Sequence, residues 1–166
     1  MNKNKGFSLI ELLIVVAIIL IIAAIAIPNL LRSRIAANEA SATATMRTLN
    51  TSEVTYASTY NSGFTDDLHM LGTPGSGNQP TNNLADLVDP ILAGNGPGGS
   101  ATSFTKNGYA FTYSHTGQTY PQISSYGVNG DPMARGSSGQ RSFFSDQSAV
   151  VHANATAQAT GSDNPI

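Results

Sequence analysis

The first 60 positions contain two different patterns of hydrophobic residues. Every residue from Leu12 to Ile27 is apolar, and with residues 7–11 the segment reaches about 20 residues. A helix of about that length is enough to cross a hydrocarbon core of about 30 Å. The first pattern therefore predicts a membrane-spanning helix over residues 7–28, with Pro28 expected to kink or interrupt the helix that continues beyond it.

Beyond Pro28 the apolar residues recur at helical spacing instead of continuously. Plotted at about 100° per residue, they fall within one arc of roughly 80°. They are Leu31, Ile35, Ala42, Met46, Leu49, Tyr56 and Tyr60. Polar residues, among them Glu39, Asn50 and Glu53, lie between them, so residues 29–61 are predicted to form an amphipathic helix that ends near Asn61-Ser62-Gly63. Its apolar stripe is expected to pack on a sheet of the same subunit.

The remainder of the chain predicts loops followed by strands. Residues 62–107 are rich in small and polar residues and are predicted to be a variable loop region, with a short helical turn before Pro90. Residues 108–166 are predicted to hold an antiparallel sheet of three or four strands and a C-terminal tail. The three candidate strands are Tyr109–Ser114, Gln118–Val128 and Ser142–His152. The expected fold class is α+β, a long N-terminal helix packed on a small sheet.

Composition narrows the classes of function. Only 11% of the 166 residues are charged, the net charge is -2, and the few Lys and Arg are dispersed. No basic stripe is present to follow a phosphate backbone, so nucleic acid is not expected as the primary partner. The chain has no cysteine, which excludes a disulfide framework and a thiolate metal site.

Motifs for catalysis or cofactor binding are weak. The segment Gly94–Gly99 fits G-x-G-x-x-G, but no strand precedes it and no helix follows it in the predicted structure, so it is interpreted as a loop. His69, His115 and His152 are isolated, and the loop aspartates lack calcium-binding spacing. We therefore expect no enzyme activity, no cofactor and no metal site. Asn50-Thr51-Ser52 and Asn154-Ala155-Thr156 match the glycosylation acceptor pattern, which is common by chance.

A charged residue near the start of the apolar segment needs an explanation. An acid within a membrane costs about 2.5–3.5 kcal/mol on insertion scales, so Glu11 is expected to have a cationic partner. A plain anchor with Glu11 near the lipid headgroups is an alternative. A secretory signal peptide is another, since Lys3 and Lys5 form a basic start and Ala24-Ile25-Ala26 has the form of a cleavage site. Glu11 argues against the signal peptide.

The segment from residue 3 to residue 18, KNKGFSLIELLIVVAI, resembles the N-terminal signature of type IV pilins and type II secretion pseudopilins. The resemblance implies that a prepilin peptidase removes residues 1–6 by cutting between Gly6 and Phe7, and that the new N-terminus at Phe7 is methylated. It also implies that Glu11 pairs with the N-terminal amine of a neighbouring subunit. Pro28 matches a proline at which pilin helices partly melt.

The same resemblance implies a location and a set of partners. The expected precursor spans the bacterial inner membrane once, with its N-terminus inside, and later joins an extracellular or periplasmic filament. Its expected partners are copies of itself or related pilins, the prepilin peptidase, the inner-membrane assembly machinery and, before assembly, membrane lipid. Small residues beside the apolar stripe, such as Ala36, Ala40 and Ala44, are suited to close packing against neighbouring helices.

The predicted function is thus a structural subunit of a type IV pilus-like filament, with two alternatives. A pseudopilin of a type II secretion system shares the N-terminal signature, and the lack of a C-terminal disulfide loop keeps this alternative open. A membrane-anchored binding protein or enzyme is the other, and Gly6 and Glu11 argue against it.

Overall fold

The computed structural model describes residues 6–97, 99–115 and 123–166. The chain divides into two compact units, Met1–Arg34 and Ile35–Ile166. One long helix, α1 (Leu9–Tyr60), runs through both units and has helical residues on each side of Pro28. It ends at the predicted place, where Asn61 and Gly63 take positive φ angles of 50° and 77° that stop a right-handed helix.

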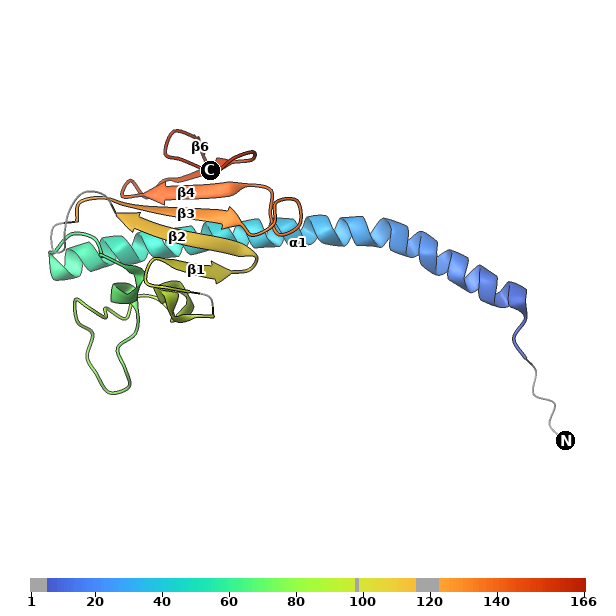
Figure 1. Ribbon diagram of the computed structural model, residues 1–166, viewed down its shortest axis with the longest axis horizontal. Coiled ribbons are helices and arrows are strands. Elements are labelled where there is room, and N and C mark those ends of the chain that lie inside the picture. Colours follow the sequence, from blue (N-terminus) through green and yellow to red (C-terminus); the bar gives the residue numbers. More distant parts are fainter. Residues whose placement is uncertain (1–5, 98, 116–122) are drawn as a thin grey trace. The chain divides into compact units, whose positions relative to one another are not determined.

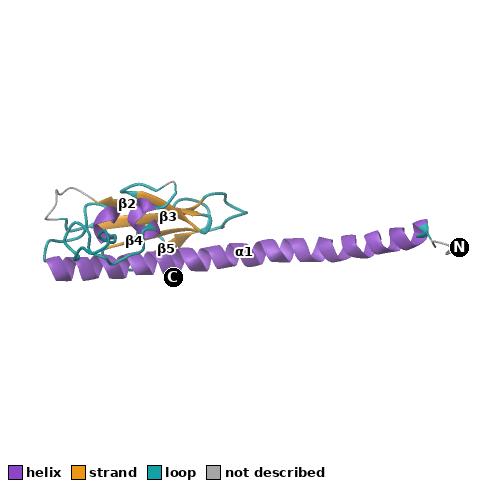
Figure 2. Ribbon diagram, turned by 90° about the horizontal axis from the view of Figure 1, so that it is seen from below, coloured by secondary structure: helices purple, strands orange, loops and turns teal. Residues whose placement is uncertain are grey.

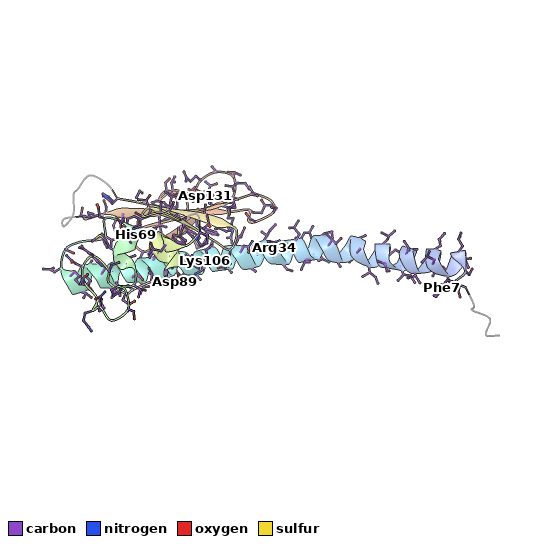
Figure 3. All side chains as sticks on the ribbon, turned by 60° about the horizontal axis from the view of Figure 1, so that its bottom comes forward. Phe7, Arg34, His69, Asp89, Lys106 and Asp131 are labelled. Carbon is purple, nitrogen blue, oxygen red and sulfur yellow. The ribbon has the colours of Figure 1, made fainter. Side chains whose placement is uncertain are left out.

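In the first unit, α1 is long and apolar enough to cross a membrane. Its large apolar side chains from Phe7 to Leu31 are all at least 42% exposed, and Figure 3 shows side chains standing out around the helix between Phe7 and Arg34. Leu31 itself is exposed, so its assignment to the buried stripe was wrong. The stripe that meets a core begins after the first unit, where Ile35 is half-buried.

In the second unit, six antiparallel strands form one sheet in which each strand pairs with the next along the chain. They are β1 (Ser103–Lys106), β2 (Tyr109–His115), β3 (Tyr126–Pro132), β4 (Ser142–Asp146), β5 (Val151–Asn154) and β6 (Asn164–Pro165). Figures 1 and 2 show the sheet lying along one side of the C-terminal half of α1. The α+β class is confirmed, with six strands in place of the three or four predicted.

The first additional strand, β1, lies in the region that was predicted to be loop. It pairs with β2 through a two-residue turn in which Asn107 and Gly108 both have positive φ angles, 48° and 76°. Asn-Gly is the preferred sequence for such a type I′ turn. The pairing sets Phe104 opposite Phe111, and their rings stack with centroids 4.7 Å apart. The dipeptide in the sequence was the signal that would have revealed β1.

Two other strand predictions need correction. β3 begins at Tyr126 and continues to Pro132, whereas residues 118–122 of the predicted strand lie outside the described residues. The predicted strand Ser142–His152 is two strands, β4 and β5, because the chain reverses between them with Ala149 at a φ angle of 59°.

Two short helical turns lie in the loop region. The turn expected before Pro90 follows it instead, as η2 (Ile91–Asn95), because the Asp89 carboxylate accepts hydrogen bonds from the N–H groups of Ile91 and Leu92. A second turn, η1 (Leu68–Leu71), was not predicted, and its first N–H groups are capped by Asp67, which accepts from Met70 N–H at 3.2 Å.

The core lies between the C-terminal half of α1 and the sheet. Four residues of the predicted stripe, Ala42, Met46, Leu49 and Tyr56, are at most 2% exposed. They share the core with aromatic residues of the strands, Phe104, Tyr109, Phe111, Tyr113, Tyr126 and Phe143. Burying an aromatic or aliphatic side chain of this size contributes about 1.5–3 kcal/mol, so the stripe is a main source of the stability of this unit.

Three polar residues predicted for the outer face of α1 are buried. Glu39, Asn50 and Glu53 are 8%, 4% and 0% exposed. Each lies three or four positions from a residue of the stripe, so each borders the buried face of the helix. Sequence spacing alone missed this burial, because the partners that satisfy these side chains come from segments distant in the sequence.

Glu39 fastens the turn before β4 to α1. Its Oε1 atom accepts hydrogen bonds from the backbone N–H groups of Gln140 and Arg141, at 2.9 and 3.1 Å. Its Oε2 atom accepts from Nε and Nη2 of Arg141, both at 2.9 Å. Burial by itself would raise the pKa of Glu39, but these donors outweigh the burial and hold the pKa below its usual range.

Replacing Glu39 by Gln should destabilise the domain at neutral pH by about 1–3 kcal/mol, because a charge-assisted set of bonds becomes neutral and incomplete. Since the folded pKa is lowered, the stabilisation by Glu39 is present above the unfolded pKa and is lost as pH falls through the folded pKa. Urea unfolding of the full chain in detergent, at neutral and acidic pH, measures both effects.

The matched control is Asp86→Asn, which removes the same charge from an exposed side chain whose positive φ angle of 55° suits Asn. Equal unfolding midpoints for Glu39→Gln and the control would contradict the proposed role of Glu39.

Candidate functional site

The N-terminal end of α1 holds three of the four site residues predicted from the sequence. Gly6, Phe7 and Ser8 precede the helix, are not helical and are exposed, with Phe7 84% exposed. Figure 3 shows Phe7 at the start of the helix. The Gly6–Phe7 peptide bond is therefore an accessible bond in non-helical backbone, the kind of segment that a peptidase can bind.

The fold itself makes no demand for glycine at position 6. A Cβ atom added at Gly6 meets no atom within 4 Å, and no positive φ angle is recorded there among the described residues. A side chain at this position would therefore leave the folded structure unchanged. A requirement for glycine at Gly6 would come from a partner that binds this segment.

Glu11 caps the helix that it belongs to. Its Oε2 atom accepts a hydrogen bond from the Ser8 backbone N–H at 2.9 Å, and the Ser8 carbonyl accepts the first helical bond, from Leu12 N–H. Ser8 and Glu11 have the S-x-x-E spacing of a capping box. A negative charge here also suits the positive end of the helix dipole. This capping role was not predicted, although the S-x-x-E spacing in the sequence is a signal for it.

Pro28 is distant from the other three residues. It lies 17 positions beyond Glu11 in the same helix, a separation of about 25 Å along the axis at about 1.5 Å per residue. Proline has no backbone N–H, so the carbonyl four residues earlier lacks its usual helical donor. Gly6, Phe7 and Glu11 thus form one site, and Pro28 is a separate feature of the helix.

The histidines and loop aspartates do not assemble a catalytic or metal site. His115 Nε2 lies 3.1 Å from Asp66 Oδ1, and His152 Nδ1 lies 2.7 Å from the Asp163 carbonyl oxygen. Lys106 and Asp89, both labelled in Figure 3, form a loose ion pair at 3.9 Å. Across residues 6–97, 99–115 and 123–166, no group of three His, Asp or Glu side chains is placed to hold a metal ion.

The glycine-rich segment has a local structural role. Gly94 has a φ angle of 76°, and a Cβ atom there would lie 1.9 Å from the Ser100 carbonyl oxygen. The segment begins within the short turn η2, and the next element of the chain is the strand β1. Glycine is therefore required for a close backbone approach, and the strand and helix that a dinucleotide site needs do not flank it.

In both glycosylation acceptor patterns, the asparagine side chain makes hydrogen bonds within the folded domain. The buried Asn50 amide nitrogen donates to Ser145 Oγ at 2.7 Å and lies 3.3 Å from the Ala149 carbonyl oxygen. The Asn154 amide nitrogen donates to Asp163 Oδ1 at 2.9 Å. A glycan on either nitrogen would displace these bonds, so the folded domain disfavours both positions.

Comparison with known proteins gives a family match to the N-terminal segment and partial matches to other proteins. The family described as the prokaryotic N-terminal methylation motif matches residues 1–27. The chain is 61% identical over 44 residues to the type IV wide pilus major component PilA4 of Thermus thermophilus, and 45% identical over 56 residues to the type IV major pilin protein PilA of Myxococcus xanthus. No solved structure matches the chain.

These matches are partial. They cover 26% and 34% of this chain, and the chain spans only 34% and 26% of the length of the two relatives. The matched family covers the Gly6–Phe7 bond, the capping glutamate and the apolar residues of α1 up to Ile27. The chain therefore carries, over residues 1–27, the prokaryotic N-terminal methylation motif.

Proposed function

We propose that this protein is a structural subunit of a type IV pilus-like filament, matured by cleavage after Gly6 and N-methylation of Phe7. The observation that supports this most is the accessible Gly6–Phe7 bond placed directly before a continuous apolar helix. The two relatives that the chain partly matches are named as a type IV pilus component and a type IV major pilin. The role is mechanical, and catalysis is not part of the proposal.

The apolar half of α1 supports assembly because it cannot remain in water. Large apolar side chains are exposed around its whole circumference from Phe7 to Leu31, and a continuous apolar surface of this kind marks a membrane or protein contact. In the precursor the surrounding medium is the inner membrane. In the filament it is the same helix of other copies, joined by repeated contacts that do not close into a ring.

The exposed small residues of α1 support close packing of neighbouring helices. Ala36, Ala37, Ala40 and Ala44 are exposed, as the sequence pattern predicted. Small side chains allow helix backbones to approach closely. These residues extend the contact surface of the filament beyond the apolar half of the helix.

Glu11 fixes how far neighbouring copies are shifted along the filament axis, by pairing with a charged group of the next copy. Within the filament its carboxylate is removed from water, where an unpaired charge is strongly destabilising and a paired one is tolerated. The N-terminal amine of Phe7 in a neighbouring copy is the proposed cation. Before assembly, the bond from Ser8 N–H provides a partner within the chain. The prepilin peptidase and the inner-membrane assembly machinery complete the set of proposed partners.

The comparisons favour a pilus over the alternatives. Both relatives are named as pilus subunits, so a pseudopilin of a secretion system is the less supported reading of the same N-terminal signature. A membrane-anchored enzyme is the other alternative, and the two relatives, both named as pilus proteins, do not favour it.

The proposal predicts that processing depends on the size of the side chain at position 6. Gly6→Leu should accumulate as uncleaved precursor, whereas Gly6→Ala should retain most cleavage. The fold accepts either side chain, so a difference between the two variants would come from the peptidase. Intact-mass spectrometry of the membrane fraction distinguishes the precursor from the chain that begins at methylated Phe7. Normal cleavage and normal surface fibres in Gly6→Leu would refute the filament proposal.

A second prediction separates the charge of Glu11 from its capping role. Gln retains a side-chain oxygen that can accept from Ser8 N–H, as Glu or Gln does in a capping box, but has no charge. Leu has neither property. If charge pairing drives assembly, both variants should insert and be cleaved, and both should reduce the yield of sheared filaments by more than about tenfold. Filaments from Glu11→Gln at the parental yield would show that the cap suffices.

A further inference from the structure

A second glutamate of α1, Glu53, is enclosed between the helix, the segment that follows it and the sheet. Glu53 and Thr65 are both 0% exposed. Thr65 N–H donates to Glu53 Oε2 at 3.1 Å, and Thr65 Oγ1 lies 2.6 Å from Glu53 Oε1. The carboxyl group of Glu53 thus faces the backbone and the side chain of the same residue.

Tyr113 of β2 closes the group on the other side. Its hydroxyl lies 3.1 Å from Thr65 Oγ1 and donates to the Thr65 carbonyl oxygen at 2.7 Å. Glu53, Thr65 and Tyr113 are therefore linked by four close polar contacts, and every one of the three residues is buried. This set is called the Glu53 cluster.

Counted over these four contacts, the hydrogens of the Glu53 cluster favour a protonated carboxyl group. Four contacts need four hydrogens, but Thr65 N–H, Thr65 Oγ1–H and the Tyr113 hydroxyl supply three. With Glu53 ionised, the Thr65 hydroxyl donates to the carboxylate. Two hydroxyl oxygens then face each other at 3.1 Å with no hydrogen between them.

A proton on Glu53 completes the cluster. The carboxylic O–H donates to Thr65 Oγ1, the Thr65 hydroxyl donates to Tyr113, and the Tyr113 hydroxyl donates to the Thr65 carbonyl oxygen. Thr65 N–H donates to the remaining carboxyl oxygen. Each buried donor and acceptor then has a partner, which the low-dielectric interior strongly favours.

The surrounding charges agree with a neutral carboxyl group. The titratable groups on the packed elements are Asp66 on the following segment, Tyr109, Tyr113 and His115 on β2, and Tyr126 and Asp131 on β3. His115 is engaged with Asp66 at 3.1 Å, and within the described part of the chain no cationic group lies within 4.0 Å of Glu53. Burial raises the pKa of Glu53 in spite of the bonds from Thr65 and Tyr113, and burial likewise raises the pKa of Tyr126.

We propose that Glu53 is a protonated carboxylic acid in the folded domain, and that its proton is a latch that fastens the segment after α1, Gly63–Asp66, to the helix and to β2. Loss of the proton leaves a buried charge without a cation and breaks the chain of donors. The proposal concerns the folded domain and is independent of filament assembly.

The latch gives the domain a definite pH dependence. The folded pKa of Glu53 is raised above the unfolded value of 4.5. Its contribution is therefore fully present below pH 4.5 and is lost as pH rises through the folded pKa. Between the two pKa values, the unfolding constant should increase about tenfold per pH unit relative to a variant that has no proton to lose.

Infrared spectroscopy of the full chain in detergent tests the protonation state directly. At pH 7 the parent should show the carbonyl band of one protonated carboxylic acid among its ten Asp and Glu residues. The band should vanish in Glu53→Gln and remain in Glu39→Gln, whose carboxylate is held ionised by Arg141. Absence of the band in the parent, or its presence in Glu53→Gln, would overturn the proposal.

A second measurement tests the pH dependence. Urea unfolding of the full chain from pH 5 to 8 should show a smaller pH dependence for Glu53→Gln than for the parent, because the variant has no proton to lose. Equal pH dependences would contradict the latch.

Discussion

The structure depends on the contact between the C-terminal half of α1 and the sheet. A helix of this length gains little from backbone propensity alone, and its stability in water comes mainly from the face that it buries. The stripe centred on Met46 and Leu49 supplies that face, and the aromatic residues of the strands cover it. The N-terminal half has no such cover among the described residues, and the proposed function assigns lipid or other copies of the chain to that role.

Polar residues at the border of this contact give it specificity, and two of them respond to pH in opposite directions. Glu39 is held ionised by Arg141 and two backbone N–H groups, so acid weakens the turn before β4. Glu53 is buried without a cation in the described structure, so base weakens the segment after α1. The two glutamates act on different loops, and the helix holds both loops best at intermediate pH.

Patterns within short stretches of the sequence predicted the structural features that depend on neighbouring residues. The apolar segment, the amphipathic stripe, the helix end at Asn61 and the alternation in β2 follow from side-chain periodicity and turn residues, and the structure contains them. The burial of Glu53 depends on Thr65 and Tyr113, which the fold brings to it, so no spacing rule revealed it. The Asn107-Gly108 turn and the Ser8–Glu11 cap also have local sequence signals, the Asn-Gly dipeptide and the S-x-x-E spacing, although neither feature was predicted.

The cap on α1 bears on how a membrane precursor becomes a filament. A carboxylate that exchanges lipid for a protein interior needs a partner at every stage, since an unpaired charge in either medium is costly. In the folded chain Ser8 N–H is such a partner for Glu11, and it remains in the chain after a cut at Gly6. The proposed cut would create a new amine at Phe7, two residues before the helix begins. Under the proposed function, cleavage thus adds a cation near an acid that is already positioned by its helix, so the proposed pairing between copies requires little further ordering of the glutamate.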